Sequence, residues 1–184
     1  HGEIYHKAYG HRALVPTVEL MTEDTIFDMA SLTKVVACTP AVMLLVERGQ
    51  VTLDEPVQTY IPEFKDDGKE AITVRQLLTH TSGLRPDIST RPEWSGQQTA
   101  IRMACQEKLQ APPGTKFRYS DINLFLVGEI VQRVSGRKLE EFVSQPDQFD
   151  EPATQEEFID QIRSQLHCCA QATRSVVEQR ENDC

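Results

Sequence analysis

The chain has 184 residues with 28 acidic and 19 basic side chains, and its net charge of −9 excludes a strongly basic protein. This length fits one domain, or one domain with a tail, and the 39% hydrophobic content is typical of a globular protein. The acidic balance argues against nucleic acid or an anionic membrane surface as a partner, and no stretch approaches the roughly 20 apolar residues of a membrane span.

The first third of the chain predicts one strand and one buried helix. Residues 2–10, GEIYHKAYG, are rich in strand-forming residues and end on a glycine, which predicts an edge strand. Residues 31–50 are apolar on nearly every side, which predicts a buried helix that Gly49 ends. Pro40 lies inside this helix and has no N–H to donate, so we expect a kink near Val36.

Four more helical segments follow, over residues 73–80, 97–109, 121–136 and 138–145. Thr73 is placed to cap the first of them, and Gly83 falls in the turn beyond it. Asp121 is expected to cap the third, and Gly136 to end it.

The last 40 residues have a different composition. Residues 145–184 hold nine acids and three arginines, so their net charge is −6 of the total −9. Residues 144–154, SQPDQFDEPAT, are typical of a linker, and an apolar stripe with helical spacing follows. The sequence therefore predicts a domain over 1–144 and an acidic, helical tail of unknown role over 145–184.

Cysteines and the first residue give little information on compartment. The five cysteines are an odd number without a C-x-x-C pair, so they predict neither a disulfide framework nor a zinc site. The chain begins at His1 and contains no recognisable signal peptide, so we expect a processed N-terminus or a piece of a longer protein. The localisation is left open.

Ser31 and Lys34 stand three residues apart at the start of the apolar helix. This spacing puts both side chains on one helix face, where they can touch. A serine hydroxyl needs a nearby base to become a nucleophile, and burial against Val35 and Val36 is expected to lower the pKa of Lys34. N–H groups at the helix start can also stabilise an oxyanion. The pattern therefore predicts an activated serine.

Chance weakens this motif when it is taken alone. Nine serines and seven lysines give about a third of a random Ser-x-x-Lys match per chain. A second match, Ser135 to Lys138, lies in a turn between helices and is interpreted as structural. His80 and Ser82, in LTHTSG, are interpreted as a hydrogen-bonding residue and a turn residue.

Further segments join the first motif in a defined order. FDMASLTKVVACTPAVMLLVERGQ is followed by ITVRQLLTHTSGL, by APPGTKF and by RYSDINLFLVGEI. Over residues 3–144 this order resembles the serine β-lactamase and penicillin-binding superfamily, and most of all its class C branch with β-lactamase-related esterases and D-aminopeptidase-like hydrolases. The resemblance implies an α+β, β-lactamase/transpeptidase-like fold, of which this chain holds mostly the helical part with N-terminal strands.

The resemblance also implies roles for four residues. Ser31 would be the acylated nucleophile, and Lys34 would accept its proton or hold Tyr119 as a phenolate. Tyr119 would be the general acid and base for the leaving group and the deacylating water. Asp121 falls where the family often has asparagine and would bind Lys34 or the substrate amide. Its charge would hold Lys34 protonated and shift the role of base to Tyr119. No metal or cofactor is implied.

Two departures from the family are visible. Its third motif, a K-T-G or H-x-G on a C-terminal strand, supplies the second oxyanion N–H, and no such motif follows Asp121. Family members are also roughly twice this length, and the match ends near Gln145. We therefore expect an incomplete copy of the family domain that lacks the C-terminal sheet strands, with activity impaired accordingly.

Two functions are compatible with these features. The first is a serine hydrolase that acts through an acyl-enzyme on an amide, β-lactam or ester, with a lean towards esterase or peptidase because Tyr-Ser-Asp is common among the related esterases. The second is a non-catalytic homologue that binds peptide or cell-wall fragments. The expected partner is a small-molecule or peptide substrate. The oligomeric state is open, and the family is often periplasmic or secreted.

Overall fold

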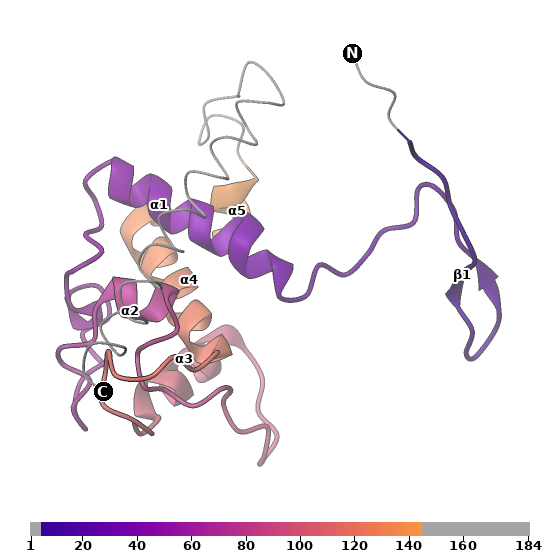
Figure 1. The fold of residues 1–184 in the computed structure, drawn as a ribbon. Helices are drawn as coiled ribbons and strands as arrows, with labels where there is room; N and C mark the ends of the chain where they lie inside the picture. Colours follow the sequence, from indigo (N-terminus) through magenta and orange to yellow (C-terminus); the bar gives the residue numbers. More distant parts are fainter. Residues whose placement is uncertain (1–4, 145–184) are drawn as a thin grey trace, which may run out of the picture. The chain divides into compact units, whose positions relative to one another are not determined.

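The computed structural model describes residues 5–144, which form two units divided between Leu32 and Thr33 (Figure 1). The linker and tail predicted over 145–184 lie outside the described residues. No helix among the described residues is both long and apolar enough to cross a bilayer.

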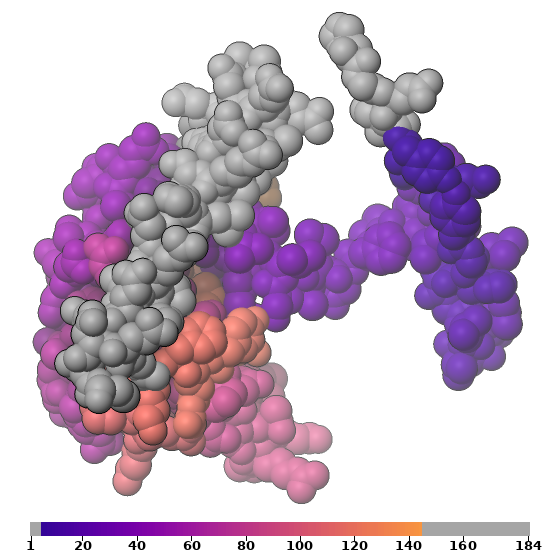
Figure 2. All heavy atoms as spheres, viewed as in Figure 1, coloured from indigo at the N-terminus to yellow at the C-terminus, as the bar shows by residue number. Residues whose placement is uncertain are grey.

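The first unit contains a short antiparallel hairpin of β1 (His11–Ala13) and β2 (Glu19–Leu20). The edge strand predicted over residues 2–10 is therefore wrong for its described part, because residues 5–9 form no regular element. Gly10 adopts a φ of 69°, and its carbonyl oxygen accepts a hydrogen bond from the Met21 N–H at 3.0 Å directly before β1 begins. The space-filling view shows the hairpin as a narrow band of atoms (Figure 2).

The second unit is helical and is organised around its longest helix, α4 (Asp121–Ser135). This helix contacts the other α-helices of the unit (Figure 1), which are α1 (Thr39–Glu47), α2 (Val74–Leu78), α3 (Gln97–Gln106) and α5 (Leu139–Val143). Two shorter helical segments complete it, the π-helix η1 (Lys34–Cys38) and the 3-10 helix η2 (Val57–Thr59). Six of the buried core residues lie on α4, namely Ile122, Leu124, Leu126, Val127, Ile130 and Val131. The apolar face of α4 thus forms the centre of the core.

Capping residues define these helices much as predicted. The Thr73 hydroxyl oxygen accepts a hydrogen bond from the Gln76 N–H at 3.3 Å, and the Thr73 N–H donates to Gln76 Oε1 at 3.1 Å, which makes a capping box before α2. Gly136 ends α4 in the left-handed conformation, and Gly49, with a φ of 68°, follows α1. Asp121, however, is the first residue of α4 rather than its cap, because Ser120 occupies the N-cap position.

The apolar helix near the N-terminus departs from its prediction in two ways. Before Pro40 the chain forms the π-helix η1, in which the Thr39 N–H donates to the Lys34 carbonyl, where we predicted a kink near Val36. The helix is also buried along one stripe only, formed by Cys38, Ala41, Val42 and Leu45. Val35 and Val36 lie outside this stripe and are 44% and 52% exposed.

A close backbone approach joins the turn after α2 to the segment before α4. Gly83 accepts a hydrogen bond from the Gln110 N–H at 2.8 Å, and Thr81 accepts one from the Gly114 N–H at 2.8 Å. Gly83 has a φ of 83°, and a Cβ on it would lie 2.1 Å from the Ala111 carbonyl oxygen. Only glycine fits there, and the contact carries the chain towards residues 118–121.

Candidate functional site

Lys34, Tyr119 and Asp121, which the sequence predicted as site residues, lie together in the second unit. The Lys34 Nζ is 2.7 Å from Asp121 Oδ1 and 5.1 Å from the centre of the Tyr119 ring. Lys34 lies on η1 and Asp121 on the first turn of α4, and these two elements pack against each other. The site is therefore fixed by the packing of one helix start on another.

The charge of Lys34 differs from the first expectation. Desolvation by burial is the largest single influence and lowers its pKa, but hydrogen bonds and charge interactions with Asp121 and Tyr119 outweigh it. The pKa of Lys34 is therefore raised above its ordinary value of 10.5. The expectation that apolar neighbours make Lys34 a neutral base is wrong, because Val35 and Val36 face outward and a carboxylate lies beside the amine.

Ser31 lies in the first unit, at a turn with unusual backbone geometry. Ala30, which precedes it, has a φ of 42°, and its N–H donates to Asp28 Oδ1 at 2.8 Å. Such left-handed non-glycine residues are often found at functional sites, because the strain has to be held by the surrounding structure. Ser31 itself is exposed. Its approach to Lys34 and Tyr119 stays a prediction from the sequence.

His80 lies beside Tyr119, and the structure confirms the hydrogen-bonding role predicted for it. The two ring centres are 4.7 Å apart, and the rings are tilted by 35°. The His80 Nδ1 is 3.2 Å from the Ser120 backbone nitrogen and 3.2 Å from Asn123 Nδ2. Burial lowers the pKa of His80, and the charge of Lys34 adds to this effect. A neutral imidazole therefore supports the phenol.

Sequence reasoning missed Asn123, which is fully buried on α4. Its Oδ1 accepts a hydrogen bond from the Ser82 hydroxyl at 2.6 Å, so Ser82 does more than form a turn. The signal was present, because Asn123 is an amide within the apolar run of INLFLV, where a buried polar group needs partners. The second Ser-x-x-Lys match is structural, as predicted: the Ser135 hydroxyl accepts from the Arg137 N–H at 3.2 Å.

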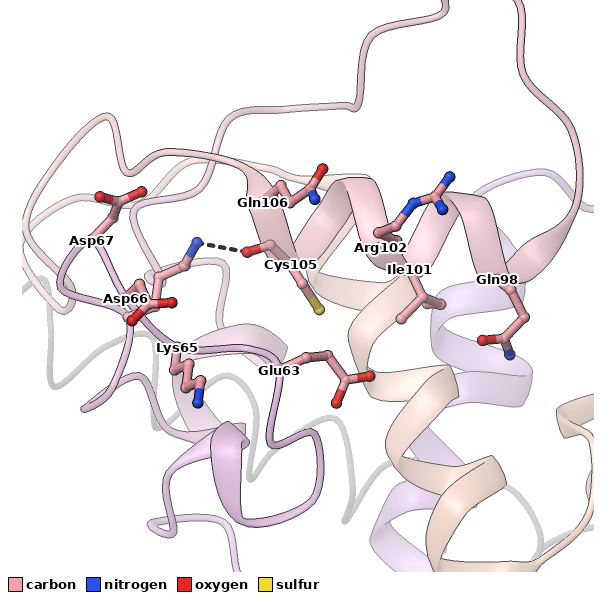
Figure 3. A pocket seen from close by; sticks show the side chains of 10 residues that line it. Glu63, Lys65, Asp66, Asp67, Gln98, Ile101, Arg102, Cys105 and Gln106 are labelled. Atoms are coloured by element: carbon pink, nitrogen blue, oxygen red, sulfur yellow. Dashed lines mark hydrogen bonds between the residues drawn. The ribbon is translucent and has the colours of Figure 1, made fainter.

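A separate cavity of about 500 Å³ lies between α3 and the loop at residues 63–69 (Figure 3). None of Ser31, Lys34, Tyr119 and Asp121 lines it. Lys69 is 1% exposed here and donates to the carbonyl oxygens of Cys105 at 2.6 Å and Glu107 at 3.0 Å. The buried amine thus binds the carboxyl end of α3, and the cavity is no part of the predicted site.

The chain is similar to a known protein family and to a curated relative. The model of the Beta-lactamase family matches residues 1–146. N-acetylmuramyl-L-alanine amidase of Bacillus subtilis (strain 168) is 34% identical over 154 residues, which cover 77% of this chain and 35% of the amidase.

Two solved structures are also similar to this chain. One is the β-lactamase/D-alanine carboxypeptidase from Pseudomonas syringae, with 25% identity, a TM-score of 0.58, and coverage of 69% of this chain and 35% of that one. The other is a family VIII carboxylesterase, with 25% identity, a TM-score of 0.51, and coverage of 59% and 31%. The chain spans about a third of the length of the curated relatives it matches.

Proposed function

Because the chain belongs to the Beta-lactamase family, we propose that it is a serine hydrolase that forms an acyl-enzyme on Ser31 with an amide, β-lactam or ester substrate. The expected α+β, β-lactamase/transpeptidase-like fold is confirmed, and the described residues supply its helical part and an N-terminal hairpin. Relatives named as an amidase, a carboxypeptidase and a carboxylesterase support hydrolase chemistry in general.

The observation that supports the proposal is that Lys34 is ion-paired with Asp121 and lies beside the Tyr119 ring. Lys34 stays protonated next to Asp121, so it does not take the serine proton itself. Its positive charge lies 5.1 Å from the centre of the Tyr119 ring and favours the phenolate form of that side chain. Tyr119 is then the proposed general base, and Lys34 the group that stabilises its charge.

The proposed reaction has four proton transfers, and all of them pass through the Tyr119 oxygen. The Ser31 Oγ attacks the carbonyl carbon of the substrate, and its proton passes to the Tyr119 oxygen. Collapse of the tetrahedral intermediate breaks the bond to the leaving group, which takes this proton from Tyr119. Water then attacks the acyl carbon and gives a proton to Tyr119. The bond from this carbon to the Ser31 Oγ breaks, the acid product leaves, and Tyr119 returns its proton to the Ser31 Oγ.

A fluorophosphonate probe tests this assignment. We expect the wild-type chain to gain the mass of one adduct, and Ser31→Ala to gain none. Ser135→Ala is the matched control, because it removes the serine of the second Ser-x-x-Lys match and is expected to react like the wild type. Intact mass and peptide mapping give the readout. A folded wild-type sample that forms no adduct would contradict the hydrolase and favour a non-catalytic homologue that binds peptide or cell-wall fragments.

The substrate class is tested by comparing p-nitrophenyl butyrate with a chromogenic cephalosporin. We propose an ester or peptide preference, because Asp121 stands where Tyr-Ser-Asp is found among the β-lactamase-related esterases. Hydrolysis should therefore be faster with the ester and absent in Ser31→Ala. Much faster hydrolysis of the cephalosporin would contradict the proposed ester or peptide preference, but it would not contradict Ser31 as the nucleophile.

A further inference from the structure

His80 holds the backbone on both sides of Tyr119. Its carbonyl oxygen accepts a hydrogen bond from the Arg118 N–H at 2.8 Å. Its Nδ1 lies 3.2 Å from the Ser120 N, whose N–H donates to it. Tyr119 lies between Arg118 and Ser120. The backbone on both sides of it is therefore hydrogen-bonded to one residue, His80.

The hydrogen-bond partners of Nδ1 define the tautomer of His80. Ser82 donates its hydroxyl proton to Asn123 Oδ1, so the Asn123 amide presents its NH₂ group to His80. The other neighbour of Nδ1 is the Ser120 N–H, which is also a donor. Two donors require a lone pair on Nδ1, so the imidazole is neutral and carries its proton on Nε2.

Tyr119 needs such support because much of it is exposed. Its side chain is 45% exposed, while Ser120 and Asn123 are fully buried. The centre of the His80 ring lies 4.7 Å from that of the Tyr119 ring, with the two rings tilted by 35°, and Lys34 lies near the phenol ring as well. His80 adopts a φ of 55°, an unfavourable value for a residue with a side chain.

We propose that His80 is a positioning residue that holds the Tyr119 ring at Lys34, through the Nδ1 hydrogen bond to Ser120 and through ring contact. This inference rests on the proposed function for its catalytic consequence, since Tyr119 is there the general acid and base. The acceptor is the decisive part, because it fixes the backbone from which the phenol extends. Displacement of a catalytic group by about 1 Å costs on the order of 10²-fold in rate.

Three substitutions of His80 distinguish the effect of its hydrogen-bond acceptor from the effect of its ring contact. His80→Asn places an amide oxygen near the position of Nδ1, and asparagine tolerates a positive φ. His80→Gln places its amide further out, near the position of Nε2, and His80→Phe keeps a ring without an acceptor. Each variant is compared with the wild type by circular dichroism and by its rate of phosphonylation by the fluorophosphonate probe, at a temperature where all four proteins are folded.

The expected result is rescue by the one variant that keeps the acceptor. His80→Asn should react within about 10-fold of the wild type, and His80→Gln and His80→Phe should be slower by on the order of 10²-fold. Equal rates for all four proteins would overturn the positioning role. A slow His80→Asn together with a fast His80→Phe would contradict the claim that the hydrogen-bond acceptor, and not the ring, positions Tyr119.

A second measurement does not depend on catalysis or on any variant's folding. In ¹⁵N-histidine NMR of the wild-type chain, we expect the His80 ring to be in the neutral Nε2–H form at pH 7.5. An Nδ1–H tautomer or an imidazolium would overturn the proposed hydrogen bond. If the wild type forms no adduct but shows the Nε2–H form, the proposed function fails while the anchoring of Tyr119 by His80 is supported.

Discussion

At the scale of single residues, the carboxylate of Asp121 contributes to keeping Lys34 charged. Asp121 lies 2.7 Å from its Nζ and raises the pKa of Lys34 above 10.5, against desolvation that lowers it. Without this carboxylate the desolvation remains and is opposed only by Tyr119, so the pKa of Lys34 is expected to fall. The choice between aspartate and asparagine at position 121 therefore affects how strongly Lys34 holds its proton.

We expect Asp121→Asn to lower the pKa of Lys34, because the amide keeps the shape of the side chain and removes its charge. The pKa is measured from the lysine side-chain resonances in a ¹³C NMR titration. Asp54→Asn is the matched control, since it removes a carboxylate that pairs with Arg75 at 2.7 Å and does not contact Lys34. An unchanged Lys34 titration in Asp121→Asn would contradict the role given to this carboxylate.

The sequence predicted those site residues that belong to short motifs, and it did not predict the contacts between distant segments. The spacing of Ser31 and Lys34 and the Tyr-Ser-Asp order identified the candidate residues, and the structure brings Lys34, Tyr119 and Asp121 together. The contacts of His80 with Ser120 and Asn123 bridge 40 and 43 residues, and no periodicity encodes such distances. The sign of the Lys34 pKa shift depended on the same long-range contacts.

At the scale of elements, α3 has an unusual end. Lys69, from a loop far away in the sequence, donates to the Cys105 and Glu107 carbonyls and is 1% exposed. The last carbonyls of a helix have no partners within it, and a cation placed there also interacts favourably with the helix dipole. The buried amine thus ties the loop at residues 63–69 to α3.

Lys69→Met should lower the free energy of unfolding by about 1–3 kcal/mol, because two carbonyls lose a buried donor while the apolar stem is kept. Lys65→Met is the matched control, since Lys65 is an exposed lysine of the same loop and should change stability by less than about 0.5 kcal/mol. Urea unfolding followed by circular dichroism measures both. Equal midpoints for the two variants would show that Lys69 contributes no specific stabilisation.

The sequence predicted helix ends correctly where single residues determine them, and it failed to predict which helix face is buried. Thr73, Gly49 and Gly136 mark helix ends through their own backbone preferences, so the sequence alone located α2, the end of α1 and the end of α4. The burial of residues 31–50 depended on which face meets α4, and apolar content does not reveal that face. Val35 and Val36 are consequently exposed although the whole segment was expected to be buried.

At the scale of the whole molecule, the order of several motifs predicted the family and the fold class correctly. The family match ends at residue 146, and the predicted division at 144 stays a prediction because residues 145–184 are not described. The described core gathers around α4 from segments between residues 38 and 142. Its stability is therefore a property of the second unit, in which the half-buried His80 and the exposed, ion-paired Glu63 both have lowered pKa values.

His80 and Glu63 predict two separate acid steps in stability. Burial lowers the pKa of His80 from its ordinary 6.5, with Lys34 adding to the effect and Asp121 opposing it. The unfolded chain therefore binds this proton first as pH falls below about 6.5, and stability drops until the folded pKa is passed. A hydrogen bond from Arg133 lowers the pKa of Glu63 from 4.5, so stability falls again below that pH.

Unfolding free energies measured in urea between pH 8 and pH 3 check both steps. One proton gives a slope of at most about 1.4 kcal/mol per pH unit. His80→Asn should flatten the profile just below pH 6.5 and leave the lower step, and Glu63→Gln should do the reverse. These variants are controls for each other, because both are read in the same titration. A slope below pH 6.5 that persists unchanged in His80→Asn would show that burial of this imidazole does not govern the first step.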